Sequence, residues 1–155
     1  MELFRITQEK FAVDLSGNGS RIFGGRWNSE GYYALYASAT RSLALLETLA
    51  HTPAKMLASN NYQLITLHAP DNPPTDSIPL DALPAGWDAA DVRIFTQKIG
   101  DQFLTEKINL MIAVPSVVIR EEMNYVINPL HTDMKKVTII NQRQIYFDNR
   151  VSAHL

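Results

Sequence analysis

The order of extended and helical segments is the feature that most constrains the fold of this chain. Apolar and polar residues alternate in patterns that predict strands at residues 33–37, 62–68, 111–118 and 137–140. Helices are predicted at residues 41–51 and from residue 88 onward. These segments do not follow the regular strand–helix–strand rhythm of a doubly wound parallel sheet. We therefore expect a mixed α/β (α+β) fold, in which a single domain surrounds a partly antiparallel sheet.

Local signals mark the ends of the two helices. Thr40 is suited to cap the N-terminus of the first helix, and Pro53 requires it to end near His51. In the second helix, apolar residues recur at helical spacing: Val92, Phe95, Ile99 and Phe103. Gly100 is expected to interrupt that pattern, because glycine disfavours a helix interior.

The chain length and one proline-rich segment indicate the domain organisation. A chain of 155 residues is long enough to bury about two-thirds of its unfolded surface in one core. Residues 69–86 contain five of the eight prolines, so this segment must be mostly irregular. We expect one domain over residues 1–155, with a proline-rich surface excursion at about 69–86.

Charge and composition exclude several classes of function. The formal net charge is -2 and the basic residues are scattered, which argues against direct binding to nucleic acid. Without cysteine the chain has no disulfides and no thiol nucleophile, and its four histidines show no metal-binding spacing, so we expect no metal. No signal peptide or membrane-spanning run is visible, which favours a soluble cytoplasmic protein.

Two charged residues lie in unusual surroundings. Arg26 lies in the glycine-rich motif Gly24–Asn28, and its planar guanidinium suits phosphate or carboxamide recognition. Glu47 falls at the border of the apolar arc of helix 41–51, where a carboxylate is costly unless something binds its oxygens. The simpler alternatives are a surface ion pair for Arg26, and for Glu47 a pairing with Arg41 or Lys55. If both are functional, they indicate a site for a phosphorylated, polar ligand.

A tyrosine and a serine are further candidates. Tyr36 lies in the strand at residues 33–37, where its ring could line a pocket or fill the core. Ser116 places a hydroxyl inside the apolar segment Val114–Val118, and a buried serine usually binds a nearby carbonyl. Because no Gly-x-Ser-x-Gly motif surrounds it, a serine hydrolase is not expected.

Five ordered motifs together resemble the RES domain family. They are Gly24–Asn28 (GGRWN), Tyr36–Ser38 (YAS), Leu43–Glu47 (LALLE), Val114–Ser116 (VPS) and Asn124–His131 (NYVINPLH). The family is named after an arginine, a glutamate and a serine, which correspond here to Arg26, Glu47 and Ser116. The resemblance extends over nearly the whole chain.

The resemblance implies a function and a fold. RES proteins are toxins of bacterial type II toxin-antitoxin pairs, their partner is an Xre-like helix-turn-helix antitoxin, and their fold resembles that of ADP-ribosyltransferases. Members degrade NAD+ by hydrolysis or phosphorolysis, and one branch transfers ADP-ribose to a protein. All three reactions begin by cleaving the nicotinamide–ribose bond, with NAD+ as substrate and no other cofactor. A homodimer within the antitoxin complex is also consistent with the resemblance.

The resemblance also assigns roles to the candidate residues. Glu47 would stabilise the positive charge that develops on the ribose, and Arg26 would bind the diphosphate or orient the nicotinamide ribose. Tyr36 would border the nicotinamide, and Ser116 would bind the ribose or orient Glu47. The other expected contacts to NAD+ lie in the shared motifs: Gly25, Trp27 and Asn128.

Competing functions stay open at this stage. A binding module without turnover would be expected to lose Arg26 or Glu47, and both are present. A protein ADP-ribosyltransferase is the main alternative, because water, phosphate and a protein are all possible acceptors. A ribonuclease fits poorly, because the chain lacks a histidine pair and a basic surface.

Overall fold

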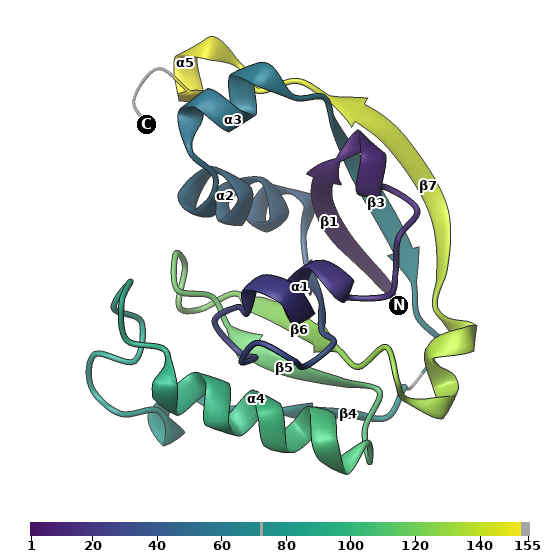
Figure 1. Cartoon of the computed structure of the whole chain (residues 1–155), viewed down its shortest axis with the longest axis vertical. Helices are drawn as coiled ribbons and strands as arrows, with labels where there is room; N and C mark the ends of the chain where they lie inside the picture. The colour runs from purple at the N-terminus through teal and green to yellow at the C-terminus, as the bar shows by residue number, and fades with distance from the viewer. Residues whose placement is uncertain (72, 153–155) are drawn as a thin grey trace.

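The computed structural model describes residues 1–71 and 73–152, which form one mixed sheet with helices around it (Figure 1). The strands are β1 (Glu2–Gln8), β2 (Leu35–Ser38), β3 (Tyr62–His68), β4 (Thr75–Ser77), β5 (Met111–Pro115), β6 (Met123–Ile127) and β7 (Thr138–Ile145). Their order across the sheet is β4-β5-β6-β2-β1-β3-β7. Only the β4–β5 pair is parallel among these described strands. The expected mixed α/β fold with a partly antiparallel sheet is confirmed.

Five α-helices connect and cover the strands within the described residues. They are α1 (Asn18–Phe23), α2 (Arg41–His51), α3 (Ala54–Ser59), α4 (Ile94–Glu106) and α5 (Asn149–Ser152). The bounds predicted for α2 are confirmed, and the Thr40 hydroxyl accepts a hydrogen bond from the Leu43 backbone N–H at 3.0 Å. None of the described helices is both long and apolar enough to cross a membrane.

The sheet opens between β1 and β2. These two strands pair only at Phe4 and Ser38, whereas β1 pairs with β3 along its whole length, from Glu2 to Gln8. Beyond that single pair, β4-β5-β6-β2 and β1-β3-β7 diverge (Figure 1). We call the opening between β1 and β2 the fork. Helix α2 follows β2 directly, and its Ala44 packs with Phe4 of β1 and Leu64 of β3.

Strand β5 contributes residues to two apolar cores, one on each face of the sheet. Met111 packs with Leu35 and Ile127 on one face of the sheet. Ile112 and Val114 face the other side, where the second core is completed by residues of α4 and of the loops: Trp27, Trp87, Phe103 and Leu104. Strand β5 is therefore buried on both faces, which accounts for its continuous apolar sequence.

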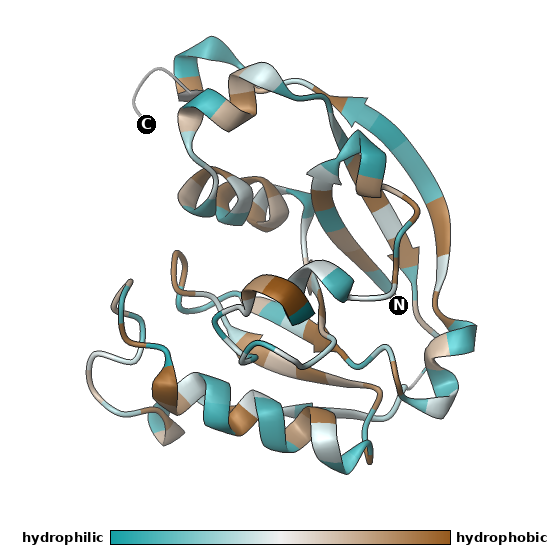
Figure 2. Ribbon diagram, in the orientation of Figure 1, coloured by the Kyte–Doolittle hydropathy of each residue, from teal (hydrophilic) through white to brown (hydrophobic). Residues whose placement is uncertain are grey.

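Helix α4 differs from the prediction in its start and in its buried face. It begins at Ile94 instead of residue 88, and Gly100 does not interrupt it. Its buried residues are Thr96, Gly100, Phe103 and Leu104, while Val92 and Phe95 are 44% and 41% exposed. The reason is steric: Gly100 lies against the backbone of Trp27, and this close approach selects the face of the helix that packs inward. Hydrophilic and hydrophobic residues alternate along α4 in Figure 2.

Several strand ends differ from the prediction, because pairing with a neighbouring strand extends or ends a strand independently of its apolar pattern. The predicted strand 62–68 matches β3, but 111–118 ends at Pro115 in β5, and 33–37 shifts to 35–38 in β2. The predicted strand 137–140 lengthens into β7, whose mostly exposed, polar residues pair with β3 at the sheet edge. The proline-rich excursion contributes the short strand β4.

Strands β1 and β6 were not predicted. On a helical wheel, Leu43, Leu46, Leu49 and Ala50 share the apolar arc predicted for α2, but Leu46 and Ala50 are exposed.

We predict that Gly100→Ala strongly destabilises the fold. An added Cβ would lie 1.6 Å from the Trp27 carbonyl oxygen, so helix or loop must move. Overpacking of this kind should cost about 3 kcal/mol or more in the free energy of unfolding, measured by urea denaturation. Gly19→Ala in α1 is the matched control, because nothing lies within 4 Å of its added Cβ. Equal unfolding midpoints for Gly100→Ala and wild type would contradict this packing.

Candidate active site

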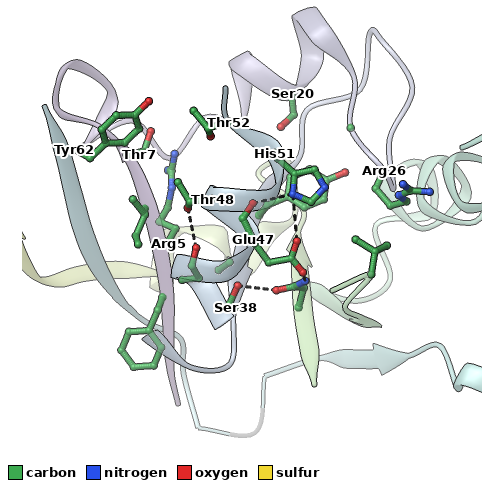
Figure 3. A pocket seen from close by; sticks show the side chains of 18 of the residues that line it. Arg5, Thr7, Ser20, Arg26, Ser38, Glu47, Thr48, His51, Thr52 and Tyr62 are labelled. Carbon is green, nitrogen blue, oxygen red and sulfur yellow. Dashed lines mark hydrogen bonds and ion pairs between the residues drawn. The ribbon is translucent and has the colours of Figure 1, made fainter. Parts of the chain in front are cut away.

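A pocket of about 520 Å³ lies in the fork of the sheet (Figure 3). One wall comes from β1, including Phe4 to Gln8, and another from residues 24–27 and Tyr36 of β2. Helix α2 contributes Glu47 and His51. This size is in the range of pockets that bind small molecules and cofactors. The fork thus brings the glycine-rich motif and α2 to one cavity.

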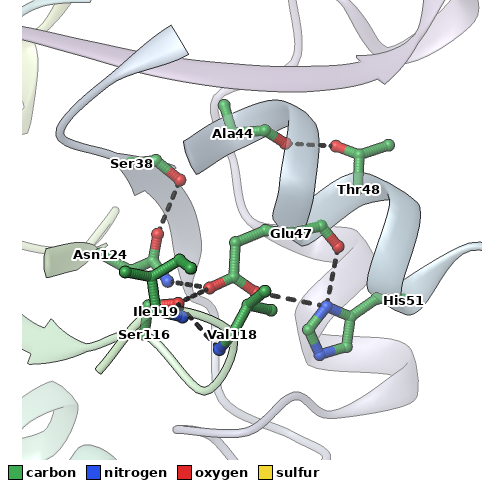
Figure 4. A network of polar contacts seen from close by, with 9 residues as sticks. All are labelled: Ser38, Ala44, Glu47, Thr48, His51, Ser116, Val118, Ile119 and Asn124. Atoms are coloured by element: carbon green, nitrogen blue, oxygen red, sulfur yellow. Dashed lines mark hydrogen bonds and ion pairs between the residues drawn. The ribbon is translucent and has the colours of Figure 1, made fainter. Parts of the chain in front are cut away.

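Glu47 projects from α2 into this pocket, with 18% of its side chain exposed. Its Oε1 accepts two hydrogen bonds of 2.6 Å, from the Ser116 hydroxyl and from the Asn124 side-chain amide (Figure 4). Its Oε2 lies 3.4 Å from Nδ1 of His51, and no hydrogen bond reaches Oε2 within the described part of the chain. Pairing with Arg41 is wrong, because Arg41 lies beside Glu2. The carboxylate is held by one oxygen and presents the other.

Ser116 lies fully buried immediately after β5. The backbone N–H groups of Val118 and Ile119 both donate to its Oγ at 3.0 Å, so the hydroxyl proton is directed at Glu47 (Figure 4). A buried serine usually donates to a backbone carbonyl, but Ser116 donates to the carboxylate of Glu47. Ser116 therefore contacts Glu47 directly, whereas a contact of Ser116 with the ribose stays a prediction.

Arg26 lines the pocket and also holds a loop. Its Nη1 donates to the backbone carbonyls of Trp87, Ala89 and Val92 at 3.0, 2.9 and 2.8 Å, while its Nε is buried without a partner. Burial lowers the pKa of the Arg26 guanidinium, and the charge of Arg93 lowers it further. No carboxylate of the described residues lies within 4 Å of it. The simple alternative of a surface ion pair is wrong.

Tyr36 and Gly25 both line the pocket and lie close to each other. The Tyr36 hydroxyl donates to the Asn28 side-chain oxygen at 2.7 Å and accepts from the Trp27 backbone N–H at 3.0 Å. A Cβ on Gly25 would lie 2.7 Å from that hydroxyl, so only glycine allows this approach. Desolvation raises the pKa of Tyr36 well above its ordinary value. Tyr36 both lines the pocket and holds the glycine-rich motif in place.

The remaining two sequence candidates lie in different places. Trp27 borders the pocket, but it is only 3% exposed and packs against Trp87 at a ring-centroid distance of 6.1 Å. Asn128 is not among the residues that line the pocket. It is buried beyond the C-terminal end of β6, where its amide donates to the Leu104 carbonyl and its oxygen accepts from the Leu130 N–H. The structure does not bring Asn128 to the pocket.

Reasoning from the sequence missed several polar residues of the pocket, among them Arg5, Ser38, His51 and Asn124. Arg5 of β1 donates to the Asp14 backbone carbonyl at 2.9 Å, and desolvation lowers the pKa of its guanidinium. An arginine between the apolar residues Phe4 and Ile6 was the available signal. Asn124 lay in a recognised motif, but nothing in that motif indicated its contact with Glu47.

Sequence comparison identifies the family to which this geometry belongs. A family model described as RES domain matches residues 2–148. The chain belongs to the RES domain family. It is 37% identical over 142 residues to the "Prs ADP-ribosylating toxin" of Sphingobium sp., covering 90% of this chain and 88% of the relative. It is 30% identical over 153 residues to "Toxin Res" of Photorhabdus laumondii, covering 97% of each chain. The resemblance seen in the five motifs is confirmed, and both of these relatives are named as toxins.

The fold has a counterpart among solved structures. The crystal structure of the M. tuberculosis MbcT-MbcA toxin-antitoxin complex contains a chain similar to this RES domain, with a TM-score of 0.77 and 21% sequence identity. The match covers 99% of this chain and 87% of the other. The overall arrangement of the RES domain described above is therefore shared by a solved protein.

We predict that Tyr36→Phe destabilises the RES domain by about 1–3 kcal/mol at neutral pH, because the buried partners of the hydroxyl lose their bonds. Above the ordinary tyrosine pKa of about 10, the unfolded wild type ionises Tyr36 while the folded state keeps it neutral. Wild-type stability then falls, and the difference from the variant shrinks. Chemical denaturation at neutral pH and above pH 10 measures the difference in unfolding free energy between wild type and variant. Tyr146→Phe is the control, because Tyr146 is 78% exposed. A constant difference at all pH values would contradict the assignment.

Proposed function

We propose that this RES domain is a toxin that depletes NAD+ by cleaving the nicotinamide–ribose bond. The observation that carries the proposal is the Glu47 carboxylate in the pocket: Oε1 accepts two hydrogen bonds, whereas Oε2 accepts none from the described residues and lies 3.4 Å from Nδ1 of His51. A growth arrest would follow from the loss of NAD+, and neutralisation by an antitoxin would restore growth.

The chemistry requires a fixed negative charge. Cleavage of the bond leaves positive charge on C1 of the ribose in an oxocarbenium-like transition state. A carboxylate that is already oriented stabilises this charge without reorganising during the reaction. Glu47 meets that requirement, because Ser116 and Asn124 hold one of its oxygens. Oε2, which lies beside Nδ1 of His51, would face the ribose.

Two arginines on different walls of the pocket suit a diphosphate. Arg5 lies on β1 and Arg26 on the segment before β2, and both line the pocket. Their guanidinium groups form charge-assisted hydrogen bonds with phosphate oxygens, and a dianionic ligand would offset the cost of burying them. The ring of Tyr36 lies on the same side as Arg26 and would border the nicotinamide.

An antitoxin partner and a cytoplasmic location belong to the same proposal. The solved structure that shares this fold is a complex of a toxin with its antitoxin. We infer a cognate antitoxin of the Xre-like, helix-turn-helix type for this chain, and a homodimer of the toxin within that complex.

A protein acceptor is the second candidate. The 37% identical relative from Sphingobium is named as an ADP-ribosylating toxin. Transfer of ADP-ribose to a protein starts from the same bond cleavage, so the pocket geometry suits both reactions. The difference lies in which nucleophile reaches C1 of the ribose after nicotinamide leaves.

We expect brief induction of the wild-type chain, in cells without the antitoxin, to lower intracellular NAD+ and arrest growth. Glu47→Gln should abolish both effects, because removing the charge lowers the rate on the order of 100-fold or more. Arg26→Ala should also be inactive. Glu106→Gln, on the exposed face of α4, is the matched control and should behave as wild type. Arrest with unchanged NAD+ would contradict the depletion of NAD+.

The products of the purified protein distinguish the acceptors. With NAD+ in phosphate buffer, we expect nicotinamide together with either free ADP-ribose or its 1-phosphate, identified by mass. Two results together would favour the protein ADP-ribosyltransferase. Label from adenine-labelled NAD+ would stay bound to protein in a cell extract, and the purified chain would consume NAD+ slowly when no extract is added. Glu47→Gln should give none of these products.

A further inference from the structure

We propose that Asn124, oriented by Ser38, is a positioning residue that fixes Oε1 of Glu47 and thereby reserves Oε2 for the substrate. This inference rests on the proposed NAD+ cleavage and adds two residues to the site. Neither Asn124 nor Ser38 was assigned a role by its motif.

The two residues are directly opposite each other on neighbouring strands. Ser38 of β2 pairs with Asn124 of β6 in the antiparallel register, so both side chains lie on the same face of the sheet. The Ser38 hydroxyl donates to the Asn124 side-chain oxygen at 2.6 Å (Figure 4). Because that oxygen is occupied, the amide nitrogen must point away from Ser38, and it donates to Glu47 Oε1 at 2.6 Å.

Two donors on one oxygen restrict the rotation of the Glu47 carboxylate more than one donor would. The terminal torsion of a glutamate is broad and nearly two-fold, so a single hydrogen bond leaves the carboxylate free to rotate or to exchange its oxygens. Ser116 approaches Oε1 from the segment that follows β5, and Asn124 approaches it from β6. Together they fix the plane of the carboxylate, and the direction of Oε2 follows from it.

Burial makes the Ser38 contact difficult to replace. Ser38 is only 5% exposed, so water has little access to the Asn124 oxygen if the hydroxyl is removed. Without Ser38, the Asn124 amide loses the contact that determines which of its ends faces Glu47. A reversed amide would direct an oxygen at the carboxylate and repel it. Ser38 therefore acts on Glu47 only through Asn124.

The test is a double-mutant cycle on the purified full chain, with nicotinamide release from NAD+ measured at steady state. We expect Asn124→Ala to lower kcat by about 10- to 100-fold with little change in KM, since a mispositioned group affects the transition state more than ground-state binding. Ser38→Ala should lower kcat less. In the Asn124→Ala background, Ser38→Ala should have no further effect, because the two residues act as one unit.

Two more variants separate positioning from packing. Asn124→Asp keeps the shape of the side chain but replaces the donor with a second carboxylate, so at neutral pH it should lose at least as much kcat as Asn124→Ala. Asn61→Ala is the matched control: its amide donates to Glu9 at an exposed position outside the pocket lining, and its kcat should equal that of wild type. Thermal melts report which variants fold, and if Asn124→Ala does not, Ser38→Ala and Asn124→Asp decide the test through kcat.

The outcomes separate this inference from the proposed function. A wild type that releases no nicotinamide overturns the proposed function and this inference with it. An active wild type combined with a wild-type kcat in Asn124→Ala or Asn124→Asp, or with a loss confined to KM, overturns the inference alone. Multiplying losses in the cycle would overturn the role assigned to Ser38. A kcat loss in both single variants without a further loss in the double variant supports it.

Discussion

The single backbone pairing between β1 and β2, at Phe4 and Ser38, is the constraint on which the rest of this structure depends. A sheet that paired along its whole length would be closed at this position, whereas here the two strands diverge and leave a pocket between them. Helix α2 follows β2 across the opening and packs on β1 and β3 through Ala44. The pocket is thus built into the sheet, and its walls are strands whose positions are fixed by their other neighbours.

Polar contacts at the pocket tie together segments that are far apart in the chain. Glu47 extends from α2 to Ser116 and Asn124, which belong to the β5–β6 side. Arg26 ties the glycine-rich motif to the carbonyls of the loop before α4. Buried charges of this kind are costly unless their hydrogen bonds are satisfied, and here Glu47 Oε2 and Arg26 Nε lack hydrogen bonds within the described residues. Both groups border the pocket, where a polar ligand could satisfy Oε2 and a phosphate could lie beside Arg26.

The sequence was most informative where short-range rules decide the structure. Thr40 and Pro53 delimit α2, and the helical position of Glu47 already indicated partial shielding. It was less informative about α4: Phe103 of the predicted apolar face is buried, but Val92 and Phe95 are exposed. There, the contact of Gly100 with the Trp27 backbone overrides the apolar pattern, because steric exclusion at one point costs more than exposing two apolar side chains. Asn128 illustrates a related error: it follows the last residue of β6, and its buried side chain bonds to the backbone of Leu104 and Leu130 instead of lining the pocket.

By itself the sequence determined the fold class, the extent of α2 and the family, because each of these rests on local spacing or on ordered motifs. Only the tertiary structure decided that Ser116 donates to Glu47, that Arg26 holds a loop, and that Arg5 and Asn124 enter the same pocket. These contacts join residues from segments far apart in the chain. Their partners are set by strand order and by the fork, which no local pattern encodes.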